Sequence, residues 1–173
     1  EMWNGRGTKH IFSGSTTVKV GNDAQFALLP NATSKWPIEQ NRDNSKRRTG
    51  LLRFKGYKLD AKRYPTFMYT LNEISFEDFF KPLDSNGAGI VRKITISSSS
   101  DRQDLWFRIA LASISQEGDV FNVEGQYKVK AEGALIRQYG KIQELMVPVK
   151  FNGGKASVKV NYLFNETGLG GVQ

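Results

Sequence analysis

The sequence contains no cysteine and a single histidine, and these two scarcities exclude much of enzyme chemistry. Without cysteine, the chain holds no disulfide, thiolate zinc site, iron–sulfur cluster or covalently attached c-type haem. His10 would have to serve any catalytic triad, and no nucleophile elbow accompanies it. Because nitrogen and sulfur ligands are so scarce, a transition-metal site is disfavoured as well. We therefore expect a chain that is not an enzyme and that carries no cofactor.

Calcium is the metal that these absences leave open, because it takes only oxygen ligands. The segment 84–87 (Asp-Ser-Asn-Gly) has the first part of a calcium-loop spacing, but the closing bidentate glutamate is missing. We interpret this segment as a turn. A glycosidase would need two carboxylates that face one bond, and the neighbouring Glu77 and Asp78 point to opposite sides of an expected strand.

Long apolar runs are also absent, since none approaches the roughly 20 residues that span a bilayer. No succession of charged, apolar and small residues marks a signal peptide, so we expect no membrane span. The 173 residues, of which 39% are hydrophobic, predict one domain over residues 1–173 with a core large enough to fold unaided. Because the chain begins with Glu1, we expect it to be a processed or excised piece of a longer protein.

Helical periodicity is scarce, whereas two-residue alternation is frequent. Leu105, Phe107 and Ile109 share one face of an extended segment, which is typical of a half-buried strand. The sequence predicts an all-β domain, a two-sheet antiparallel sandwich (jelly-roll-like or similar) of about ten to twelve strands. The expected strands cover residues 16–20, 25–29, 51–59, 66–71, 74–80, 90–97, 105–109, 120–123, 126–129, 145–151 and 155–164.

Turn signals suggest how these strands are joined. Asn152-Gly153 supplies the positive φ angles of a tight hairpin between residues 145–151 and 155–164. A second hairpin is expected at Asn72, and a third pairing at residues 132–133. Pro148 cannot donate to a ladder, so its strand is expected to lie at a sheet edge or to carry a bulge.

Positive charge is in excess, with a net charge of +8. The densest basic run, residues 46–48, lies in a polar loop, while other lysines alternate along strands, as Lys155 and Lys159 do. That spacing favours a solvated sheet face, and we expect no nucleic-acid partner. If the ligand is a glycan, the charge favours an acidic or sulfated one.

The aromatic residues offer the one candidate for recognition, because an exposed ring can cover the apolar face of a sugar. A long polar loop over residues 30–50 contains Trp36, the best-placed ring, and loops on β scaffolds are frequent binding sites. Trp3 in the N-terminal segment is the second. The alternative is that both tryptophans pack on the sandwich. Polar groups near Trp36 that would hydrogen-bond a sugar are Asn31, Gln40, Asn41 and Arg42.

Several segments look familiar when they are taken together. They are residues 54–60 and 65–69, 91–96 and 144–149, with residues 2–5 and the stretch from Phe26 to Trp36-Pro37 as a matching opening. Together they resemble an accessory β domain of large secreted bacterial proteins, which join it to c-type cytochrome modules and β-propellers similar to sorbosone or glucose dehydrogenases. The resemblance implies a periplasmic or extracellular location, in a parent protein that oxidises or degrades carbohydrate. It assigns no role to individual residues.

Three hypotheses follow. The first is a non-catalytic accessory module that binds a polysaccharide or oligosaccharide through Trp36 and Trp3. The second is a structural or docking domain that contacts neighbouring domains of the same polypeptide, which an exposed apolar patch would support. The third is a sugar-active enzyme of sandwich fold, which would need a pocket with two facing acids, or with His10 and an acid.

Overall fold

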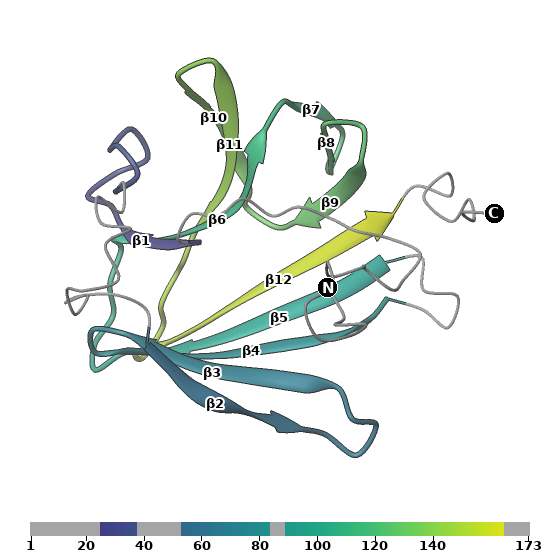
Figure 1. Ribbon diagram of the computed structural model, residues 1–173. Helices are drawn as coiled ribbons and strands as arrows, with labels where there is room; N and C mark the ends of the chain where they lie inside the picture. Colours follow the sequence, from purple (N-terminus) through teal and green to yellow (C-terminus); the bar gives the residue numbers. More distant parts are fainter. Residues whose placement is uncertain (1–24, 38–52, 84–88, 165–173) are drawn as a thin grey trace, which may run out of the picture.

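The computed structural model describes residues 25–37, 53–83 and 89–164. In these residues the chain forms twelve strands and no helix, and all the strand pairs are antiparallel (Figure 1). The predicted all-β, two-sheet fold is therefore confirmed. The strands are β1 (Phe26–Leu28), β2 (Arg53–Leu59), β3 (Pro65–Leu71), β4 (Ile74–Pro82), β5 (Gly89–Ser97), β6 (Leu105–Ala112), β7 (Ile114–Glu117), β8 (Val120–Val123), β9 (Tyr127–Ala131), β10 (Leu135–Tyr139), β11 (Ile142–Pro148) and β12 (Lys155–Phe164).

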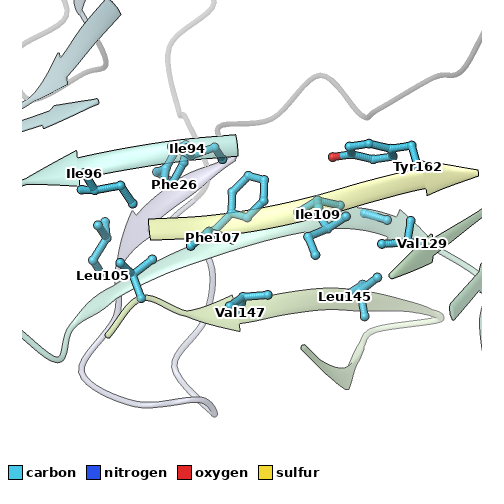
Figure 2. Close-up of a cluster of buried hydrophobic side chains, with 14 of the residues drawn as sticks. Phe26, Ile94, Ile96, Leu105, Phe107, Ile109, Val129, Leu145, Val147 and Tyr162 are labelled. Carbon is cyan, nitrogen blue, oxygen red and sulfur yellow. The ribbon is translucent and has the colours of Figure 1, made fainter. Parts of the chain in front are cut away.

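The two sheets differ in width. The smaller sheet has the order β1-β6-β11-β10, and the larger has the order β2-β3-β4-β5-β12-β9-β8-β7. Their facing sides share one apolar core, to which β1, β5, β6, β11 and β12 all contribute side chains (Figure 2). Fully burying one such aliphatic side chain stabilises the fold by about 1.5–3 kcal/mol. Among the described residues there is no helical segment of the length and apolarity that crossing a bilayer takes.

Alternation along the strands explains which face is buried. In β5, Ile94 and Ile96 are buried while Lys93 and Thr95 are exposed. β6 is different, because nearly all its side chains are buried. Its second face is covered by a small cluster around Trp36, so the smaller sheet is buried on both sides there.

The predicted hairpin at Asn152 is wrong in its pairing, although the turn itself exists. Asn152 forms a bridge with Lys155, and Gly153 and Gly154 have φ angles of 58° and 72°. However, β11 belongs to the smaller sheet and β12 to the larger. The turn is therefore a corner at which the chain passes from one sheet to the other. The turn at residues 132–133 joins β9 to β10 in the same way, so the third predicted pairing is also wrong.

Of the other local predictions, one is confirmed and one is wrong. The turn at Asn72, whose φ is 52°, joins β3 to β4 as a hairpin. Pro148 ends β11, which lies between β6 and β10 and carries a register shift between Leu145 and Met146. A bulge is therefore present in this strand pair, but its extra residue, Ile109, lies in β6, so the expectation that the strand of Pro148 is an edge strand or carries the bulge is wrong. The expected strand at residues 16–20 lies outside the described residues.

Candidate binding surface

Trp36 packs on the outer side of the smaller sheet. It is 2% exposed and belongs to a small cluster with Leu29, Trp106 and Met146. The guanidinium of Arg108 lies 4.5 Å from the centre of its ring. This is the packing alternative considered for the sequence, and it leaves no ring face of Trp36 for a sugar to cover.

The loop around Trp36 is fixed by its own hydrogen bonds. The side-chain oxygen of Asn31 accepts bonds from the amide of Thr33 at 3.0 Å, and from the hydroxyls of Thr33 and Ser34. Arg137 donates to the carbonyl oxygens of Ala32 and Ser34, which ties the loop to β10. Asn31 is thus engaged in a turn. The other expected sugar contacts, Trp3, Gln40, Asn41 and Arg42, lie outside the described residues, as does the segment 84–87.

Four large apolar side chains lie exposed on one face of the larger sheet, and we call this surface the apolar face. Phe54 is 65% exposed, Tyr57 61%, Leu59 44% and Phe67 37%. Phe54 pairs with the core residue Tyr69, and Tyr57 pairs with Phe67, so all four share the side that forms the core elsewhere in the sheet. A pattern that normally marks buried positions therefore continues here onto the surface.

The width of the two sheets explains this exposure. The smaller sheet ends at β1, whose Phe26 packs on Tyr69 and Phe76 of β3 and β4. β2 and the start of β3 extend away from it (Figure 1). The apolar face is therefore the uncovered margin of the core.

The rings of Tyr57 and Phe67 on this face, and the neighbouring half-buried Phe80, pack on one another at steep angles. The ring centres of Tyr57 and Phe67 are 6.2 Å apart with planes tilted by 46°, and those of Phe67 and Phe80 are 5.8 Å apart at 72°. Such tilted contacts are favourable for aromatic pairs. They give a continuous apolar surface whose rings are not coplanar.

A buried ion pair lies where the apolar face meets the core. Arg92 donates two hydrogen bonds to Asp78, at 2.6 and 2.9 Å, and one to Gln25 at 2.9 Å. The hydroxyl of Tyr69 donates to Asp78 at 2.8 Å. The guanidinium of Arg92 also lies about 5 Å from the ring centres of Phe80 and Phe107.

Burial governs the electrostatics of this cluster. Desolvation, reinforced by the charge of Asp78, raises the pKa of Tyr69 well above its ordinary value, so the phenol stays protonated. Desolvation is the largest single cause and lowers the pKa of Arg92, but the hydrogen bonds to Asp78 and the electrostatic interactions with Asp78, Tyr69 and Tyr162 together outweigh it, so the net pKa is raised. Each partner satisfies the other, which is how buried charges are usually accommodated. The cluster ties β3, β4 and β5 to the chain before β1.

The described residues do not assemble a metal site, and their two buried acids are each held by arginine. They hold no group of three or more His, Cys, Asp and Glu side chains that suits a metal ion. Glu144 is fully buried and pairs with Arg108 at 2.7 Å and with Arg137. Asp78 and Glu144 are thus each held by arginine inside the protein.

The sequence alone does not identify the apolar face, and the reason is physical. Tyr57 and Leu59 flank Lys58, an alternation that predicts a half-buried strand with its apolar side chains inward. That the covering sheet stops short is a property of the whole fold. The one local signal is the bulge between Phe54 and Gly56, because bulges are common in edge strands.

No family model, curated protein or solved structure matches this chain. Its function is therefore inferred from the described geometry, in which the apolar face is the most distinctive surface feature.

Proposed function

We propose that this chain is a non-catalytic docking module whose apolar face binds the surface of another protein domain. The observation that carries the proposal is the exposure of Phe54, Tyr57, Leu59 and Phe67 on one face of β2 and β3. Contiguous apolar patches of this kind on soluble domains mark interaction surfaces, and aromatic side chains are typical anchors at their centres.

The chemistry of the face favours a protein over a glycan as its occupant. Phe54, Leu59 and Phe67 carry no polar group, whereas a sugar presents hydroxyls that need partners. The nearest buried polar cluster, Asp78 with Arg92, is already satisfied within the core. The tilted rings suit the irregular apolar surface of a protein better than the flat face of a sugar ring.

The proposed partner is a neighbouring domain of the same polypeptide. This rests on the resemblance to an accessory β domain of secreted bacterial proteins, which implies a periplasmic or extracellular multidomain parent. On this proposal the apolar face is covered in the parent protein and exposed when the chain is isolated.

The test is a binding measurement between this chain and the separately produced remainder of its polypeptide. We expect binding that is lost in the double variant Phe54→Ser/Tyr57→Ser. The matched control is Ile142→Ser, because Ile142 is 40% exposed but lies on the smaller sheet. Absence of binding, or equal weakening by the control, would overturn the proposal.

Carbohydrate binding is a second candidate, and the exposure of Tyr57 is the observation that favours it. At 61% exposure, this ring has surface free for a sugar to stack on, and its hydroxyl is a hydrogen-bonding group. Affinity electrophoresis in gels of neutral polysaccharide tests this. Retardation that Tyr57→Ala abolishes and Tyr57→Phe largely retains would support it, whereas unretarded migration across a broad panel would reject it.

A further inference from the structure

The opposite face of the larger sheet carries a concentration of lysines. On four neighbouring strands, every described lysine points to this outer side, because each pairs in register with outward-facing residues. All are exposed except Lys130, which is half-buried. We call this surface the basic face, and it consists of Lys81 in β4, Lys93 in β5, Lys128 and Lys130 in β9, and Lys155 and Lys159 in β12.

Two of these lysines are direct neighbours across a strand pair. Lys93 of β5 is in register with Lys159 of β12. Like charges placed directly opposite each other are destabilising in a sheet. One row further along, Lys81, Val91, Asn161 and Lys130 follow one another across the four strands. Lys93 and Lys159 are thus roughly 5 Å apart across the strands, and Lys128 and Lys130 are roughly 7 Å apart along β9.

The acidic side chains near this face do not neutralise the positive charge of its lysines. Glu77 on β4 pairs with Lys58 at 3.2 Å, and Asp119 pairs with Lys130 at 3.1 Å. Among the described residues, Lys81, Lys93, Lys155 and Lys159 form no ion pair. A face that serves solubility alone usually mixes both signs of charge. This face concentrates one sign of charge at exposed positions, which attracts polyanions.

The side chains around the lysines favour a polysaccharide over a nucleic acid. Surfaces that bind single strands combine positive charge with aromatic rings on which bases stack. On the outer side of β4, β5, β9 and β12, the one aromatic ring among the described residues is Phe79, which is half-buried. The charges are lysines, which act as point charges, whereas arginine binds phosphate in a bidentate manner. Hydroxyl-bearing Thr95 and Ser157 lie beside them as hydrogen-bonding groups.

We propose that the basic face binds an anionic polysaccharide, with Lys93 and Lys159 at its centre. The proposal is independent of the docking function, because the apolar face lies on the other side of the sheet. It also differs in location from any sugar contact at Tyr57. The two surfaces would let one module contact a partner domain and an acidic polymer at once.

The test is the salt-dependent binding of the 173-residue chain to heparin and polygalacturonate, with neutral dextran and single-stranded DNA as comparisons. We expect the sulfated or carboxylated polymer to bind, with Lys93→Gln/Lys159→Gln weakening it about tenfold at low salt. We also expect the slope of log affinity against log salt to fall by about two, one for each lysine removed.

The matched control is Lys141→Gln/Lys150→Gln, which removes the same charge from exposed positions outside the larger sheet. Tyr57→Ala should leave polyanion binding unchanged, which separates this proposal from the functions proposed for the apolar face. No binding to either polyanion at low salt would overturn the inference. If the control variant loses as much polyanion affinity, binding depends on net charge and not on the basic face, and the inference is overturned. Tighter binding to single-stranded DNA than to either polysaccharide would reject a polysaccharide as the ligand.

Discussion

In the part of the chain that the structure describes, buried charge is organised in two clusters of arginine and carboxylate, one in each sheet. In the larger sheet, Asp78 is held by Arg92, and in the smaller sheet Glu144 is held by Arg108 and Arg137. A buried ion pair adds little net stability compared with apolar residues of the same size, but losing one partner leaves an uncompensated buried charge. The two clusters therefore act as constraints on which strands can pack together.

Asp78→Ala should destabilise the protein by about 3–5 kcal/mol, because the guanidinium of Arg92 would remain buried without its anion. The double variant Asp78→Leu/Arg92→Met removes both charges and should recover most of that loss. Urea unfolding followed by circular dichroism measures both. If the single variant unfolds at the same urea concentration as the wild type, the ion pair does not constrain the fold as argued.

Lys93→Gln should stabilise the protein by a few tenths of a kcal/mol, because it removes the like-charge contact with Lys159. The gain should shrink in high salt, since both side chains are exposed and screened. Thermal melts at 20 and 500 mM salt provide the measurement. Lys141→Gln is the control, and a larger gain there would contradict the contact.

At the scale of the strands, the corner at residues 152–154 determines how the sandwich closes. The amide of Gly154 donates to the carboxylate of Asp101 at 2.6 Å, and its carbonyl accepts from the amide of Ser98 at 2.8 Å. These bonds attach the turn to the segment that follows β5. The corner therefore positions the start of β12 against β5 as the chain leaves the smaller sheet.

Gly154→Ala should cost more stability than Gly153→Ala, although both residues have positive φ angles. Both variants place a side chain in a left-handed conformation, which costs about 1–2 kcal/mol. A Cβ at Gly154 would also lie 2.6 Å from the carbonyl oxygen of Ser98, whereas a Cβ at Gly153 meets open space. Chemical denaturation of the two variants measures the difference. Equal losses of stability in the two variants would show that the turn can move away from residues 98–101 at no cost.

The strands and turns were largely predictable from the sequence, while the assignment of strands to sheets was not. Apolar residues such as Leu105 and Phe107 recur at every second position because one side of the strand is buried, and this pattern can be read from the local sequence. The turn at Gly153 was recognisable because its backbone needs glycine. Nothing local distinguishes a hairpin from a corner between sheets, because that depends on which distant strand, here β5, pairs with β12.

The same limit applies to the candidate surfaces. The polar loop around Trp36 predicts an exposed binding residue, yet the burial of Trp36 against Trp106 depends on how that loop folds back on the smaller sheet. Tyr57 looked like an inward residue, and its exposure follows from the narrowness of that sheet. The alternating lysines were correctly placed on a solvated sheet face. Their clustering required the order of β5, β12 and β9, which brings Lys93 opposite Lys159.

At the scale of the whole molecule, the larger sheet presents different chemistry on its two sides. One side packs on the smaller sheet and continues outward as the apolar face of β2 and β3, while the other displays the basic face. The core between the sheets also contains three buried tyrosines, Tyr69, Tyr127 and Tyr162. These phenols make the stability of the entire fold sensitive to alkaline pH.

Burial raises the pKa of all three tyrosines, and for Tyr127 the value is raised to about 12. In the unfolded chain a tyrosine loses its proton near pH 10. Above that pH the unfolded state binds fewer protons than the folded state, so the free energy of unfolding must fall as pH rises. Below pH 10 the contribution is fully present, and for Tyr127 it is lost between about pH 10 and 12.

Tyr127→Phe should therefore reduce the alkaline loss of stability by up to about 1.4 kcal/mol per pH unit above pH 10. Urea unfolding between pH 8 and 11.5 measures this slope, and the variant and the wild type should run parallel below pH 9. Tyr57→Phe is the control, because Tyr57 is exposed in the fold as it is in the unfolded chain. If Tyr127→Phe loses stability as steeply as the wild type above pH 10, then the hydroxyl of Tyr127 ionises within the folded protein. In that case β9 would open to water without unfolding of the core, and the sandwich would not unfold as one cooperative unit.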